Sequence, residues 1–227
     1  MLNQFSRTEL LIGKEGLEKL ANSRVAVFGI GGVGSYAVEA LVRSGLGTID
    51  IIDDDKVCIT NVNRQLYATR KTVGKYKVDV AKERILEINP DAVVNTYQTF
   101  YTPKTESEFD FSKYDYVIDA IDTVTAKIEL IKRCTELNVP IISSMGTGNK
   151  LDPSHLQITD IYKTKIDPLA KVMRRELKAR RIKNCLVAYS DEIPAKTGQR
   201  TPGSSVFVPA SAGLMIAGYV FQSLIGG

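Results

Sequence analysis

A glycine-rich turn between two apolar segments restricts the fold of this chain more than any other feature. Residues 24–28 form a short β-branched apolar run typical of a buried strand, and residues 33–43 place small and apolar side chains on one helical face. Between them lies Gly29-Ile30-Gly31-Gly32-Val33-Gly34, which fits G-x-G-x-x-G in the strand–turn–helix context that the motif requires. A second apolar run at residues 48–52 predicts a complete βαβ unit.

This turn predicts an adenine-nucleotide site. Glycines allow the backbone to turn tightly and to approach a phosphate, and the N-terminus of the following helix attracts negative charge. Asp53 ends the second strand, where a carboxylate can accept hydrogen bonds from a ribose diol. The predicted nucleotide-binding residues are therefore Gly29, Gly31, Gly32, Gly34 and Asp53. The motif alone leaves the nucleotide open, because enzymes that use NAD or FAD share it.

Strand-like and helix-like segments continue to alternate along the chain. Helices are expected at residues 14–20, 78–88, 125–137 and 168–180, and strands at 92–97, 114–120, 140–144, 155–161 and 186–189. This order predicts an α/β fold with a doubly wound, Rossmann-like, mainly parallel sheet that further strands extend in the C-terminal half. We expect residues 1–227 to form a single ATP-binding domain with a basic segment at 163–183, a mobile loop at 191–205 and an apolar helix at 206–225.

Composition indicates the cellular compartment in which the protein is expected. The three cysteines lie far apart and form no CxxC pair, which excludes a disulfide framework and fits a reducing cytosol. Residues 201–227 carry no charge and approach the length of a membrane span, but Pro209, Gly213 and Gly218 interrupt them. A buried or subunit-interface helix fits the same pattern, so we expect a cytoplasmic protein without stable membrane insertion. Peripheral membrane association stays open.

A set of polar residues after the glycine turn favours adenylation over hydride transfer. Asp53-Asp54-Asp55 is followed by Asn61-Val62-Asn63-Arg64-Gln65, then by Lys77 and, after another strand, by Asp122. Attack on the α-phosphate of ATP develops charge on phosphate oxygens, which calls for cationic side chains and a carboxylate-held Mg²⁺. Arg64, Lys77 and Asp122 have the required chemistry, and Asn61 and Gln65 can orient phosphate or ribose. A nicotinamide enzyme has no need for this set.

Together these motifs resemble the ubiquitin-activating-enzyme-like (ThiF-type) adenylyltransferases, from Ser6-Arg7 to beyond Gly146. The resemblance implies that Asp53, with Asp55 beside it, holds the ribose and that Arg64 and Lys77 hold the phosphates. It also implies that Asp122 holds Mg²⁺ and that Arg7 is a second arginine at the phosphates. Such enzymes are commonly homodimers in which an arginine reaches across the interface, so the resemblance implies that Arg7 or Arg64 serves the site of the neighbouring subunit.

The rest of the chain is similar to one branch, the tRNA threonylcarbamoyladenosine dehydratases. The features are Phe5-Ser6-Arg7-Thr8, Lys163-Thr164-x-x-Asp167-Pro168-Leu169-Ala170, Val187-Ala188-Tyr189-Ser190-Asp191-Glu192 and Pro202-Gly203-Ser204. This resemblance implies that ATP adenylates the side-chain carboxylate of the modified adenosine beside the tRNA anticodon. The carbamoyl group of that side chain then displaces AMP and closes a ring, so that water is lost at the expense of ATP.

Charge distribution supports an RNA partner. Between residues 163 and 183 the chain has nine Lys or Arg but only Asp167 and Glu176 as acids, a pattern typical of phosphate-backbone contacts. The predicted tRNA-binding residues are Lys171, Arg174, Arg175, Lys178 and Arg181. A solvated helix face is the plain alternative.

Two other functions remain open at this stage. One is adenylation of the C-terminal glycine of a ubiquitin-like sulfur carrier, which would add a sulfur-transfer or carrier protein as a partner. The other is a non-catalytic or nicotinamide-binding Rossmann protein, which would leave Arg64, Lys77 and Asp122 without a role.

Overall fold

The computed structural model describes residues 3–199 and 201–226 as alternating helices and strands. The helices are α1 (Ser6–Asn22), α2 (Gly34–Arg43), α3 (Lys77–Ile88), α4 (Val124–Leu137), α5 (Pro168–Ala179) and α6 (Phe207–Ile225). The strands are β1 (Arg24–Phe28), β2 (Thr48–Ile52), β3 (Val93–Tyr97), β4 (Tyr116–Asp119), β5 (Ile141–Ser144), β6 (Leu156–Asp160) and β7 (Leu186–Ser190). Short 3₁₀ turns, among them η1 (Ile59–Asn61), occupy the loops.

All of these strands belong to one sheet, in the order β3-β2-β1-β4-β5-β7-β6. The neighbours are parallel except β6, which pairs with β7 in the antiparallel sense. The predicted doubly wound, mainly parallel α/β fold is therefore confirmed, including its extension by β6 and β7. The strand order reverses between β1 and β4, and such a switch point opens a crevice at the carboxyl ends of the strands.

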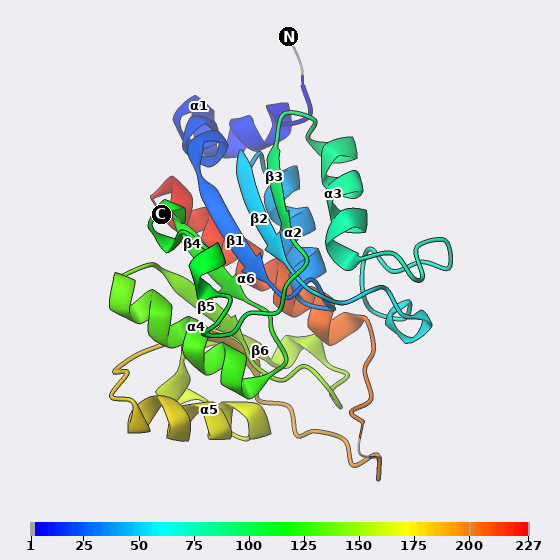
Figure 1. Ribbon diagram of the computed structural model, residues 1–227, viewed down its shortest axis with the longest axis vertical. Coiled ribbons are helices and arrows are strands. Elements are labelled where there is room, and N and C mark those ends of the chain that lie inside the picture. The colour runs from blue at the N-terminus through cyan, green and yellow to red at the C-terminus, as the bar shows by residue number, and fades with distance from the viewer. Residues whose placement is uncertain (1–2, 200, 227) are drawn as a thin grey trace.

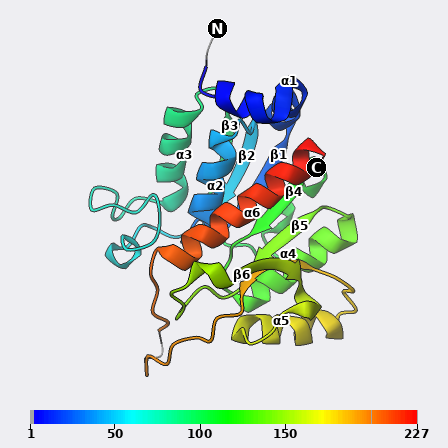
Figure 2. The ribbon, with the colours of Figure 1, turned by 180° about the vertical axis from the view of Figure 1, so that it is seen from behind.

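Helices cover both faces of the sheet. Helices α2 and α6 lie across one face (Figure 2), and α4, with α5 packed beside it, covers the other (Figure 1). On the second face, β1 and β2 are covered by an aromatic cluster of Phe28, Tyr101, Phe109 and Phe111, which the sequence patterns did not reveal. Residues 98–113 thus form a core layer without regular strands or long helices.

Helix α6 is part of the core. Val208, Ala212, Ile216 and Val220 are buried in the cluster that also holds α2. Gly213 lets the two helices touch, because a Cβ there would lie 2.3 Å from the carbonyl oxygen of Val33. The helix is long and apolar enough to span a membrane, but core helices meet the same criterion, and this one is packed against the sheet layer.

The first helix differs from the prediction. It was expected at residues 14–20, but it begins at Ser6 and is kinked at Gly13, where φ is +71°. The early turns carry Leu10 and Leu11, whose exposed fractions are 86% and 87%. Periodicity identifies a helix through a buried apolar face, and these two adjacent leucines form none.

Candidate active site

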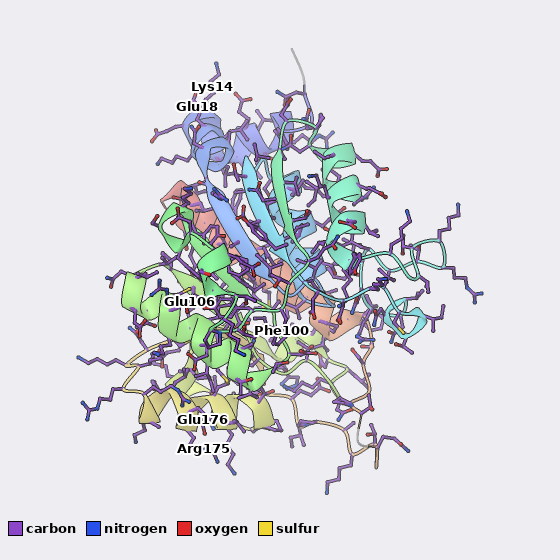
Figure 3. The ribbon with its side chains drawn as sticks, viewed as in Figure 1. Lys14, Glu18, Phe100, Glu106, Arg175 and Glu176 are labelled. Carbon is purple, nitrogen blue, oxygen red and sulfur yellow. The ribbon has the colours of Figure 1, made fainter. Side chains whose placement is uncertain are left out.

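A pocket of about 750 Å³ opens at the carboxyl ends of β1, β2, β4 and β5. One half is lined by the glycine turn, by Asp53 to Asp55 and by Asp122. Phe100, after β3, also lines it, and Figure 3 shows this residue beside the lower ends of the strands. The pocket lies where the switch in strand order places a ligand site.

The glycine turn is built for close approach of backbone to backbone. Gly29 has φ of +90°, and its N–H donates to the carbonyl oxygen of Ile52 at 2.8 Å, which ties the turn to β2. A Cβ on Gly34 would lie 1.8 Å from the carbonyl oxygen of Gly29. Helix α2 therefore starts directly at the turn, and Val33, immediately before its first residue, lines the pocket.

Asp53 is held in place by the turn and by Lys77. One carboxylate oxygen accepts from the N–H of Ile30 at 2.7 Å, and the other accepts from the N–H of Asp55 at 2.9 Å. The Lys77 ammonium, at the start of α3, lies 3.3 Å from Asp53 and 2.6 Å from Asp55. Burial raises the pKa of the Asp53 carboxyl, and the charge of Lys77 acts against that rise.

Arg64 is half-buried and lines the same half of the pocket. Its guanidinium donates to the carbonyl oxygen of Thr60 at 2.9 Å and to Asn63 at 3.0 Å, and it forms no ion pair with a described acidic residue. Gln65 is buried beside Gly31, also at the pocket. Asn61 also lines the pocket, but its side-chain oxygen already accepts from the Cys58 N–H at 2.9 Å and so stabilises η1.

Asp122 follows β4 and presents an exposed carboxylate to the pocket. Its described partner is the Thr123 hydroxyl at 3.3 Å, and no lysine or arginine of the described ranges pairs with it. Carboxylates also gather at Asp53, Asp54 and Asp55, within 4.8 Å of one another. Lys77 already pairs with two of those three, whereas the charge of Asp122 is free.

The second half of the pocket was not predicted. Its lining includes Ser144, Met145, Gly146, Thr147 and Gly148 after β5, and Thr201, Pro202, Gly203 and Ser204 before α6. Asn149 joins the two segments, since its N–H donates to the Gly203 carbonyl at 2.8 Å and its side chain accepts from the Gly203 N–H at 2.6 Å. Asn63 donates to the Ser204 carbonyl at 2.9 Å, which links this segment to the nucleotide half.

Two groups of predicted residues lie outside this pocket. Arg7 is in the first turn of α1, near the amino-terminal edge of the sheet, and does not line the pocket of its own chain. Its predicted action on a partner subunit stays a prediction. The five residues assigned to tRNA lie on α5 and just after it.

Cys185 is buried, and burial raises the pKa of its thiol to about 12, which argues against a reactive role.

The basic residues of α5 are not equivalent. Arg175 points away from the protein body (Figure 3) and pairs with Glu176 at 2.8 Å. Arg174 is half-buried and donates to the carbonyl oxygen of Thr164 at 3.0 Å and to its hydroxyl, so it anchors the helix. Lys171, Lys178 and Arg181 are exposed and form no ion pair within the described residues.

Fold and pocket define a doubly wound α/β nucleotide-binding protein in which a carboxylate, an arginine and a lysine share one pocket with a glycine turn. Within that class the chain belongs to the ThiF family, whose model matches residues 5–226. The predicted resemblance to the ubiquitin-activating-enzyme-like adenylyltransferases is thereby confirmed.

Two named relatives match nearly the full length of this chain, and a third matches about two thirds of it. The tRNA threonylcarbamoyladenosine dehydratase of Bacillus subtilis (strain 168) is 49% identical, over 99% of this chain and 96% of the relative. The crystal structure of Escherichia coli tRNA N6-threonylcarbamoyladenosine dehydratase in complex with ATP is 37% identical, with a TM-score of 0.92 over 98% of this chain and 93% of that chain. The E. coli sulfur carrier protein ThiS adenylyltransferase is 32% identical over 65% of this chain and 60% of the relative.

Proposed function

We propose that this chain is an ATP-dependent tRNA threonylcarbamoyladenosine dehydratase. The observation that carries this is the 49% identity to the B. subtilis dehydratase over nearly the full length of both chains. The alternative, activation of a sulfur carrier, has weaker support, because the E. coli ThiS adenylyltransferase matches only 65% of this chain. Neighbouring structures of the E. coli dehydratase hold ATP and AMP, the substrate and the product expected for adenylation.

The reaction has two steps. In the first, the substrate carboxylate oxygen attacks the α-phosphorus of ATP, the bond to the β-phosphate oxygen breaks, and pyrophosphate leaves. In the second, the carbamoyl group of the same side chain attacks the acyl carbon and gives up a proton. AMP leaves with the former carboxylate oxygen, so the ring closes with net loss of water.

The nucleotide half of the pocket supplies the groups that the first step needs. Asp53 would accept hydrogen bonds from the ribose, and the glycine turn with the N-terminus of α2 would face the phosphates. Arg64 and Lys77 would stabilise the negative charge that develops on the phosphate oxygens. Lys77 can do so only by exchanging part of its contact with Asp55, the more exposed of its two carboxylate partners.

Mg²⁺ fits at Asp122. Mg²⁺ usually takes one or two protein carboxylates together with substrate phosphates and waters. Asp122 offers an exposed carboxylate in the pocket that carries no ion pair within residues 3–199 and 201–226. Bound there, the metal would neutralise charge on the phosphates and orient them.

We further propose a cytoplasmic homodimer that binds tRNA through the exposed cations of α5. Leu10 and Leu11 on α1 and Leu214 on α6 are more than half exposed, which is typical of a surface that another subunit covers. Helix α1 packs beside α6, and Lys19 donates to the Ile225 carbonyl at 3.2 Å, so the helices that carry these leucines are neighbours.

The test measures whether the purified protein acts on modified tRNA or on a ubiquitin-like carrier protein. With tRNA that carries threonylcarbamoyladenosine, ATP and Mg²⁺, we expect release of AMP and pyrophosphate, and mass spectrometry should detect loss of one water from the modified nucleoside. The same tRNA without the modification is the control. AMP formation with a ubiquitin-like carrier, but none with the modified tRNA, would replace this function by the sulfur-carrier activity.

A further inference from the structure

A lysine is buried directly beneath the nucleotide half of the pocket. Lys127, in the first turns of α4, has no exposed surface, and neither has Asp119, the last residue of β4. The Lys127 ammonium lies 3.0 Å from the Asp119 carboxylate. Neither residue lines the pocket, and neither has a role in the reaction described above.

Stability alone does not explain this ion pair. Removing two charges from water costs several kcal/mol per ion after relaxation, and well-packed apolar residues of similar volume often stabilise a protein as well or better. The presence of this buried ion pair therefore needs another explanation, and the hydrogen bonds of the two side chains supply one.

Both groups bond to the backbone of the same residue, Ile121. Asp119 accepts from the Ile121 N–H at 3.1 Å, and Lys127 donates to the Ile121 carbonyl at 2.9 Å. The Ser143 hydroxyl, from β5, donates to the other oxygen of Asp119 at 2.6 Å. The loop after β4 is thus bound on one side to α4 and on the other to β5.

The glycine turn fixes the same loop from a third direction. A Cβ on Gly29 would lie 2.6 Å from the carbonyl oxygen of Ala120, so turn and loop are in direct contact. The next residue after Ile121 is Asp122, whose carboxylate faces the pocket. Asp119 holds the peptide group before Ile121, and Lys127 holds the peptide group that joins Ile121 to Asp122, so the two residues fix the backbone from which the Asp122 carboxylate extends.

We propose that Lys127 and Asp119 are positioning residues that fix the Asp122 carboxylate for the metal–ATP complex. The proposal rests on the assignment of Asp122 to the metal in the proposed function. Without Lys127, the Ile121 carbonyl loses its donor and Asp119 becomes an unpaired buried charge, so the loop shifts. A displacement of about 1 Å at a reacting group can cost on the order of a hundredfold in rate.

The experiment uses Lys127→Met, which keeps an unbranched apolar side chain one atom shorter than lysine and removes the ammonium group. Lys150→Met is the matched control, because Lys150 is equally buried and lies 2.6 Å from the buried Asp167. Binding of Mn²⁺ with a non-hydrolysable ATP analogue is measured by electron paramagnetic resonance, without tRNA. We expect Lys127→Met to weaken Mn²⁺ binding about tenfold or more, and Lys150→Met to leave it unchanged although thermal stability falls.

The outcomes of this experiment distinguish a positioning role of Lys127 from a purely structural one. The proposal holds if Asp122→Ala weakens Mn²⁺ binding and adding Lys127→Met to it causes no further loss, since two residues acting through one ligand are not additive. Equal loss in Lys127→Met and Lys150→Met, or additive losses with Asp122→Ala, would assign Lys127 a structural role only. If Lys127→Met does not fold, Ser143→Ala removes one hydrogen bond from Asp119 without unpairing a charge. Normal Mn²⁺ binding in that variant would also overturn the proposal.

This test is independent of the RNA substrate. A wild-type protein that binds Mn²⁺ and ATP but does not act on modified tRNA would contradict the proposed function and leave the role of Lys127 intact. A wild-type protein that dehydrates the tRNA, with Mn²⁺ binding unaffected by Lys127→Met, would do the reverse.

Discussion

Among single residues, Arg64 occupies an unusual position because its guanidinium reaches a polar pocket without a carboxylate partner in the described chain. Two neutral oxygens, on Thr60 and Asn63, hold it ready for an anion. Pre-organised donors of this kind stabilise charge in the transition state without rearranging during the reaction.

Arg64→Ala should therefore lower the rate of ATP–pyrophosphate exchange by about a hundredfold or more, the scale for loss of one such donor. Thermal stability should change little, because the arginine forms no buried ion pair. Arg70→Ala is the matched control, an exposed arginine on the same segment of the chain that does not line the pocket. Equal rates in both variants would remove Arg64 from the catalytic set.

Most of the nucleotide half was predictable from the sequence, and the other half was not. Gly29, Asp53 and Asp122 each follow a strand, and parallel strands bring their carboxyl ends to one edge. Gly148 and Pro202 lie side by side because β7 pairs between β5 and β6 and because Asn149 bonds to the later segment. No local pattern encodes a contact between residues so far apart in the chain.

At the scale of elements, α5 combines two kinds of cation. Arg174 anchors the helix to Thr164, whereas Lys171, Lys178 and Arg181 are exposed and unpaired among the described residues. The sequence pattern grouped them together because composition reports charge but not hydrogen bonding. The structure thus separates the exposed cations, whose loss should weaken tRNA binding, from Arg174, whose loss should lower stability.

Replacing Lys171, Lys178 and Arg181 together by alanine should weaken tRNA binding and flatten its salt dependence. Each lost phosphate contact lowers the log–log slope by about one unit. ATP binding without RNA should stay unchanged. Arg174→Ala should lower the melting temperature and have little effect on the salt slope. A triple alanine variant at Lys14, Lys82 and Lys104, exposed cations on other elements, controls for net charge. Equal slopes in the two triple variants would make the α5 face a solvated surface.

At the scale of the whole molecule, the position of Arg7 bears on whether one chain supplies a complete active site or two subunits share each site. Its helix lies near the amino-terminal edge of the sheet, opposite the pocket, so it cannot reach the phosphates of its own chain without a large movement (Figure 1). If Arg7 takes part in the reaction, it would act in the pocket of a partner subunit, and the interface would have to extend from α1 of one chain to the pocket of the other.

Mixing Arg7→Ala with Asp53→Ala should then restore part of the activity that each variant lacks alone. In a mixed dimer, the chain with the intact Asp53 receives the intact Arg7 of the other. The measurement is tRNA-dependent AMP release after exchange of subunits, with exchange itself followed by native mass spectrometry. Complete exchange without recovery would mean that Arg7 serves its own chain, and full activity of Arg7→Ala alone would place Arg7 outside the reaction.

The contact between α6 and the glycine turn has a consequence for how the protein is made. Gly213 lies against the Val33 carbonyl and Pro209 lies close to Gly32, so the turn that faces the nucleotide is packed by residues synthesised after every strand of the sheet. While residues 207–225 are still inside the ribosome, the nascent chain can pair its strands but leaves the apolar side of α2 uncovered. Nucleotide binding should therefore begin only when translation has passed α6, and until then the exposed layer is a surface for chaperones.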